Sequence, residues 1–176
     1  MSRYHIRGLI DGSLSTLGIV IGASIVIGLS SEATRIIISA GIGGGIANGL
    51  SNILGAFAAE KTVAYKKLEK IERAMLKRGA IRNSRQYKKT ERVVLSSGIA
   101  DGLATIGGSM IPVLPFFILP AILALEWSVA ITLALFFAIG AYIGKISREN
   151  LVLSGFKMVI FAGLTAGAAV LVKMLI

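Results

Sequence analysis

The sequence predicts an all-α integral membrane protein, a single transmembrane domain over residues 1–176 that crosses the bilayer five times. Three observations carry this prediction. The 176 residues are 55% hydrophobic and only 16% charged, and their mean hydropathy is +0.79. The charges also gather in one region, whereas a soluble domain spreads them over its surface. Long stretches without charge fit lipid better than water as the solvent.

Five apolar segments follow one another along the chain, and each is long enough to cross, since a span needs about 20 apolar residues. They cover residues 8–29, 36–59, 93–119, 127–144 and 151–176. Pro120 is expected to end the third segment, and Trp127 to anchor the fourth at the membrane interface. Glycine runs such as GIGGG inside the spans predict close packing between helices.

Twelve of the 19 lysines and arginines fall between residues 61 and 92. The positive-inside rule places such a segment in the cytoplasm, which puts the N-terminus inside and the C-terminus outside. Arg3, Arg7, Lys145 and Arg148 then lie inside as well. We therefore expect a multi-pass protein of the cell membrane, and we do not interpret the formal charge of +10 as nucleic-acid binding.

Residues 60–92 form the one sizeable cytoplasmic insertion. An apolar stripe at helical spacing predicts that a basic amphipathic helix continues the second span; its members are Ala64, Leu68, Ile71 and Met75. This helix could lie on anionic lipid headgroups, bind a partner helix, or be solvated with a dimer seam. Gly79, Asn83 and Ser84 predict a turn before the next helix.

Two carboxylates lie inside otherwise apolar segments. Asp11 stands in GLIDGSLSTLG and Asp101 in GIADGLATIGG. A charged side chain at mid-bilayer costs about 2.5–3.5 kcal/mol on insertion scales, so an acid in this position is first a functional hypothesis. The alternative is that each aspartate caps a helix start or a glycine-hinged break near the headgroups, where the cost is small.

A polar stripe on the second span adds further oxygen atoms. Asn48 and Asn52 are one helical turn apart, and Glu60 lies two turns further toward the cytoplasm. Such oxygens suit hard or borderline cations, although amides that only join neighbouring helices, at about 0.6 kcal/mol each, are the alternative. Glu69 and Glu72 could help to collect cations, with surface ion pairs to nearby lysines as the competing interpretation.

The residues that common catalytic and cofactor sites need are missing. The chain has no cysteine and one histidine, His5, which excludes disulfides, thiolate metal sites and a Ser-His-Asp triad. It contains no GxxxxGK[ST] loop and no HExxH motif, and its glycine runs lie in apolar helix. We therefore expect neither an enzyme nor a bound cofactor.

Four segments carry a resemblance to a known family. GGSMIPVLPFFI, WSVAITLALFFAIGAYIGKIS and GFKMVIFAGLTAGAAVLVKML resemble the third, fourth and fifth helices of the vacuolar iron transporter family. GLIDGSLSTLGIVIGAS is similar to its first helix. The resemblance implies a homodimer that exchanges Fe²⁺ or Mn²⁺ for protons along a path near the subunit interface. It also implies that Asp11 is a transport ligand and that the metal is substrate, not cofactor.

The second span departs from that family. Where the family usually has a methionine after a serine and then Gly-Glu-Tyr, this chain reads SNILGAF, with Asn52 at the methionine and Ala56 at the glutamate. The insertion also lacks the glutamate-rich bundle of plant members, which indicates a divergent, prokaryotic-type branch. An amide in place of sulfur favours harder ions, so Mn²⁺ is as good a candidate as Fe²⁺, and Ca²⁺ stays open.

Two functions follow as hypotheses. The first is proton-coupled export of a divalent cation from the cytoplasm, with Asp11 as central ligand, Asn48 and Asn52 as supporting oxygens, Asp101 as second acid or proton carrier, and Glu60 at the mouth. The second is a membrane scaffold or sensor dimer whose basic helix binds a partner or anionic lipid.

Overall fold

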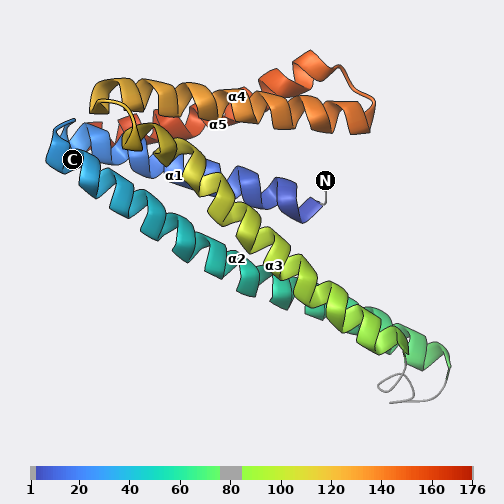
Figure 1. The fold of residues 1–176 in the computed structure, drawn as a ribbon. Helices are drawn as coiled ribbons and strands as arrows, with labels where there is room; N and C mark the ends of the chain where they lie inside the picture. Colours follow the sequence, from blue (N-terminus) through green and yellow to red (C-terminus); the bar gives the residue numbers. More distant parts are fainter. Residues whose placement is uncertain (1–2, 76–84, 176) are drawn as a thin grey trace.

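The computed structural model describes residues 3–75 and 85–175, and within these ranges the chain is helical and has no strand. The elements are α1 (Arg3–Ile27), α2 (Ser31–Ala74), α3 (Arg85–Val113), the 3₁₀ turn η1 (Leu114–Phe117), α4 (Ala121–Ser147) and α5 (Leu151–Leu175). Successive helices run in opposite directions (Figure 1), as in an up-and-down bundle.

Within the described residues, four helical segments are long and apolar enough to cross a membrane: α1, α2, α3 together with η1, and α4. In α5 the corresponding apolar stretch among the described residues, Leu151–Thr165, is shorter. The prediction of an all-helical protein with several membrane-crossing helices is therefore confirmed, and the fifth crossing stays a prediction.

The helix ends follow local signals in the sequence. Gly28 ends α1 with φ at +83°, where a residue without Cβ is unstrained. Ser30 caps α2, because its hydroxyl accepts a hydrogen bond at 3.1 Å from the backbone N–H three residues on. The expectation that the third helix runs to Pro120 is wrong. Pro112 and Pro115 remove two backbone hydrogen-bond donors, and the chain continues after α3 as the tighter 3₁₀ turn η1. Pro120 instead precedes α4.

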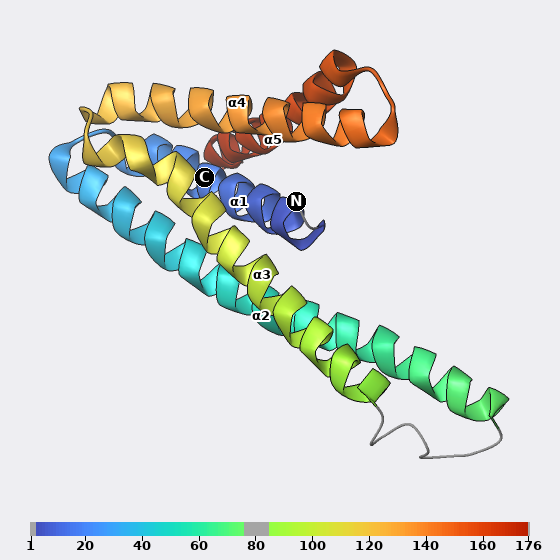
Figure 2. The same ribbon diagram turned by 45° about the vertical axis from the view of Figure 1, so that its right-hand side comes forward.

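The second helix is 44 residues long, which is about 66 Å at 1.5 Å per residue and twice a hydrocarbon core of about 30 Å. Its outer half continues the second span as predicted for the basic insertion, and residues 85–92 of that insertion form the first turns of α3. The two helices make a hairpin that extends past the rest of the bundle (Figures 1 and 2). The predicted turn residues Gly79, Asn83 and Ser84 lie outside the described residues.

Two tyrosines join the sides of this hairpin. The hydroxyl groups of Tyr65 on α2 and Tyr87 on α3 are 2.6 Å apart. Their rings meet edge to face with centroids 5.7 Å apart, a favourable aromatic geometry. The hairpin therefore has a fixed contact well outside the apolar part of α2.

Helix α3 packs extensively against α1 and α2, while α4 and α5 pair with each other and lie against α1, which contacts every other helix. Glycines bring the backbones together. A Cβ added to Gly108 of α3 would lie 2.6 Å from the carbonyl oxygen of Leu9 on α1, and one added to Gly102 would lie 2.5 Å from the carbonyl oxygen of Gly49 on α2. The predicted close packing of glycines is confirmed at these positions.

The apolar core gathers near the α1–α2 turn and η1, and each of five elements contributes one buried residue. These residues are Val20, Ile37, Val113, Phe116 and Ala124. The charged residues of α1, Arg3, Arg7 and Asp11, lie in the first half of that helix. This is the half of α1 nearer to the place where the α2–α3 hairpin leaves the bundle (Figure 1). One end of the three-helix contact is thus apolar and the other polar.

Candidate functional site

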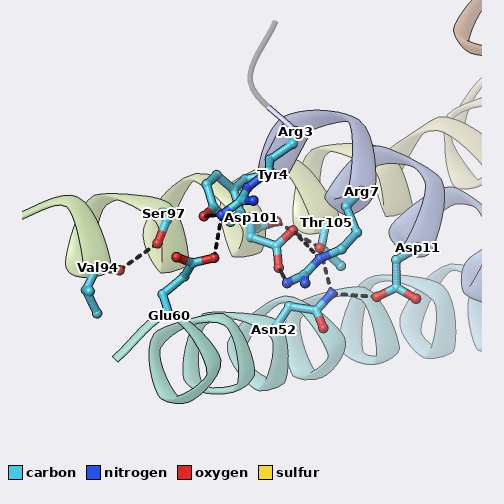
Figure 3. A network of polar contacts seen from close by, with 10 residues as sticks. All are labelled: Arg3, Tyr4, Arg7, Asp11, Asn52, Glu60, Val94, Ser97, Asp101 and Thr105. Atoms are coloured by element: carbon cyan, nitrogen blue, oxygen red, sulfur yellow. Dashed lines mark hydrogen bonds and ion pairs between the residues drawn. The ribbon is translucent and has the colours of Figure 1, made fainter. Parts of the chain in front are cut away.

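The first helix carries charged residues at intervals of four, Arg3, Arg7 and Asp11, so they lie along one face. This face is turned toward α2 and α3, and each side chain meets a partner there (Figure 3). We call these contacts the polar ladder; its pairs are Arg3–Glu60, Arg7–Asp101 and Asp11–Asn52. In the outermost pair, Nη2 of Arg3 lies 2.7 Å from Oε1 of Glu60.

The innermost pair brings three helices together at one amide. Nδ2 of Asn52 on α2 donates to Oδ2 of Asp11 on α1 at 2.5 Å and to Oγ1 of Thr105 on α3 at 2.9 Å. Thr105 is fully buried, and the other two are half-buried. A half-turn of the amide would present its oxygen instead of its nitrogen to the same place. Carboxylate, amide and hydroxyl oxygens from three helices are then within reach of one point.

The middle pair joins a fully buried carboxylate to an exposed arginine. The side chain of Asp101 is 0% exposed and that of Arg7 is 55% exposed. Nε of Arg7 donates to Oδ1 of Asp101 at 3.1 Å, and Nη2 donates to Oδ2, so the guanidinium engages both oxygens as a fork. Gly8 permits this approach, because a Cβ there would collide with the carbonyl oxygen of Asp101.

The middle and inner pairs are connected through the backbone of α3. The hydroxyl of Thr105 donates to the carbonyl oxygen of Asp101 at 2.9 Å while it accepts from Asn52. A Cβ added to Gly12 of α1 would collide with the carbonyl oxygen of Thr105. The inner two pairs therefore depend on the same close contact between α1 and α3.

The remaining predicted ligands lie beside or outside the ladder. Nδ2 of Asn48 donates to Oγ of Ser15 at 3.1 Å, one turn of α2 away from Asn52. Glu69 forms an exposed ion pair with Arg73 at 2.6 Å, and Glu72 is half-buried on the same outer part of α2. Glu69 and Glu72 lie 9 and 12 residues beyond Glu60, the outermost ladder residue of α2, which is about 14 and 18 Å along the helix, so neither glutamate reaches the ladder.

The structure thus pairs four of the predicted carboxylates with side chains of α1 or α2; they are Asp11, Glu60, Glu69 and Asp101. Among the residues that the structure describes, no three histidine, cysteine, aspartate or glutamate side chains lie together as a metal site. Asp101 and Glu60 are each held by an arginine, and Asp11 is held by an amide. A metal ion that enters the ladder must therefore exchange with these partners.

Sequence reasoning missed Thr105 and the pairing roles of Arg3 and Arg7. Their signal is the spacing of four between Arg3, Arg7 and Asp11, repeated between Asp101 and Thr105. This spacing places residues on one face of a helix. It does not name the partner, because that depends on how the helices cross.

Comparison with known proteins gives two matches. A family model described as the VIT family matches residues 64–174, which takes in the outer part of α2 and everything after it but leaves out α1 and Asn52. An uncharacterized protein of Methanocaldococcus jannaschii is 50% identical over 159 residues, which make up 90% of this chain and 81% of that protein.

Proposed function

This chain belongs to the VIT family, and on that premise we propose that it carries Fe²⁺ or Mn²⁺ across the cell membrane, out of the cytoplasm and in exchange for protons. Membrane metal-ion transport is the activity that family membership supports. One observation carries the ion site: Asp11, an acid in an apolar helix, meets Asn52 and through it Thr105, so three helices converge on oxygen donors.

The donor set fits a transported ion better than a permanently bound one. One carboxylate with an amide and a hydroxyl offers oxygen ligands without sulfur, which suits Mn²⁺, Fe²⁺ or Ca²⁺. A carrier must bind its ion well enough to admit it and weakly enough to release it. A small set of neutral oxygens around one carboxylate meets both needs.

We propose α5 as the fifth span. Its 25 residues extend about 38 Å, enough for a hydrocarbon core of about 30 Å. With the basic hairpin in the cytoplasm, the N-terminus is inside and the C-terminus outside. The polar ladder then faces the cytoplasmic side, where Glu60 stands at its mouth.

The proposed homodimer has support from the open face of α2, which carries small residues at intervals of four; they are Gly43, Ala47, Ser51 and Gly55, all exposed in the single chain. An added Cβ would meet nothing within 4 Å at Gly43 or Gly55. Membrane helices pair closely along such stripes. Because Asn48 and Asn52 adjoin the stripe in the sequence, a second copy would lie next to the Asp11 site.

Flux measurements in proteoliposomes test the function. We expect wild-type protein to move Mn²⁺ when a proton gradient is imposed. Asp11→Asn should reduce the flux by about 10-fold or more, because loss of a residue that only supports a metal ligand already lowers metal affinity or activity by about 10-fold. Glu126→Gln, which alters an exposed acid on α4, is the matched control and should retain the flux.

Two results would contradict the proposal. Equal fluxes for wild type and Asp11→Asn would remove Asp11 from the ion site. The absence of wild-type flux for Mn²⁺, Fe²⁺ and Ca²⁺ alike would contradict transport itself and favour the scaffold or sensor hypothesis.

A further inference from the structure

The polar ladder contains a cation of its own at the place where a transported cation would first meet a buried acid. Both carboxylate oxygens of Asp101 are occupied by the guanidinium of Arg7. The Asp101 side chain has no exposed surface. A metal ion therefore cannot coordinate this carboxylate until the guanidinium leaves it.

Arg7 is placed so that it can leave. Its side chain is 55% exposed, and it lies near the start of α1, so its long stem can carry the charge toward water or headgroups, as arginine does near helix ends. Asp101 has no such freedom, because the backbone of α3 beside it is in contact with Gly8 of α1. In the pair, the arginine is the mobile partner.

The charges of the ladder favour the same exchange. Two arginines and three carboxylates give it a net charge of −1. A divalent ion added to the unchanged ladder would leave a net charge of +1 beside the fully buried Asp101 carboxylate. If Arg7 moves into water as the ion enters, the net charge becomes zero. Uncompensated buried charge is strongly unfavourable, so binding and release of Arg7 should be coupled.

We propose that Arg7 is a tethered counter-cation that closes the ion path: in the ion-free protein its guanidinium occupies the Asp101 carboxylate, and an incoming divalent ion displaces it. This inference rests on the proposed transport function. It assigns Asp101 as a second ion ligand that is available only after the exchange, and it makes Arg7 a determinant of apparent ion affinity.

Removal of the competing charge should strengthen ion binding. We expect Arg7→Gln to lower the Mn²⁺ concentration for half-maximal flux by about 10-fold, which corresponds to about 1.4 kcal/mol. Arg7→Lys, which keeps the charge but not the fork, should lower it to a smaller extent. Lys157→Gln is the control, because it neutralises a similarly exposed cation, 59% exposed and paired with Glu149 at 3.9 Å, away from the ladder.

A double variant separates this role from a purely structural one. Arg7→Gln leaves Asp101 buried and unpaired, which will lower the stability. Arg7→Gln with Asp101→Asn restores a neutral pair and should recover the thermal unfolding temperature. We expect this double variant to lose the gain in Mn²⁺ affinity of Arg7→Gln, because it lacks the Asp101 carboxylate that would bind the ion. A structural pair would instead give wild-type half-saturation in every folded variant.

The outcomes distinguish this inference from the proposed function. Suppose that wild type transports Mn²⁺, but that Arg7→Gln or Arg7→Lys leaves the Mn²⁺ concentration for half-maximal flux unchanged or raises it. The proposed role of Arg7 is then wrong, while the transport function stands. If Arg7→Gln does not fold, Arg7→Lys decides the question on the same criterion. If wild type transports no divalent ion, the proposed function fails and this inference fails with it.

Discussion

Two glycines of α1 provide a direct test of how closely this helix meets α3. Gly12 and Gly22 lie in the same helix, and the same change to alanine places a methyl group in different surroundings. At Gly12 the added Cβ would lie 2.8 Å from the carbonyl carbon of Thr105 and 2.9 Å from the amide nitrogen of Ser109. At Gly22 it would meet nothing within 4 Å.

The expected difference follows from two opposing terms. Alanine favours a helix over glycine by about 1 kcal/mol at either position. At Gly12 the neighbours are backbone atoms, which cannot rotate away, and normal carbon contacts lie at about 3.5–4.0 Å, so the helices must separate by about 1 Å. Overpacking of this kind costs about 1–3 kcal/mol, and a rigid neighbour places the cost in the upper half of that range.

Gly12→Ala should therefore lower the free energy of unfolding by about 1–2 kcal/mol, while Gly22→Ala raises it by up to about 1 kcal/mol. The assay is denaturant unfolding in detergent micelles, followed by the fluorescence of Trp127, the single tryptophan of the chain. Equal stabilities, or a more stable Gly12→Ala, would refute backbone contact between α1 and α3.

Three further predictions test the hairpin, the proposed dimer and the inner pair. Tyr65→Phe removes the 2.6 Å hydroxyl contact with Tyr87 and should lower the free energy of unfolding by about 0.5–1.5 kcal/mol. The Mn²⁺ concentration for half-maximal flux should stay unchanged. A change in that concentration would show that the hairpin affects the proposed ion site. The chain has no cysteine, so Ser51→Cys should form disulfide-linked dimers in oxidised membranes, and Leu123→Cys on α4 should not. Dimers with Leu123→Cys but not with Ser51→Cys would exclude the α2 stripe as the interface. Thr105→Val keeps the side-chain volume but removes the hydroxyl that accepts a hydrogen bond from Asn52. Loss of one hydrogen bond, about 1 kcal/mol, should lower Mn²⁺ flux by about 3- to 10-fold. An unchanged flux in this variant would show that Thr105 does not orient the amide.

The helical part of the fold follows from features that act within one segment. Apolar length predicts membrane-crossing helices, and the stripe that begins at Ala64 predicts the outer part of α2, because both patterns depend on local spacing. The end of the third helix was harder to predict. Pro112 lies inside α3, and the helix ends only when Pro115 follows in the next turn, so the effect of one proline depends on the next.

The candidate site was predictable to a smaller extent. The energetic cost of acids in an apolar helix identifies Asp11 and Asp101 as residues that need partners. This cost alone does not predict that the partner of Asp101 is an arginine and that the partner of Asp11 is an amide. That choice depends on the register of α1 against α2 and α3, a property of the helix crossing that no single segment contains.

The glycine pattern of α1 links the packing to the polar ladder. Gly8 lies against the backbone at Asp101 and Gly12 against that at Thr105, so the glycines set the register in which Arg7 and Asp11 reach their partners. Larger residues at these positions would hold α1 away from α3. They would lengthen the Arg7–Asp101 contact and move Asp11 away from Thr105, whose hydroxyl positions Asn52 of α2. Gly12→Ala should accordingly lower Mn²⁺ flux as well as stability, whereas Gly22→Ala should leave flux unchanged. If Gly12→Ala were less stable but transported normally, close packing of α1 would serve the fold alone, and the ladder would have to form without it.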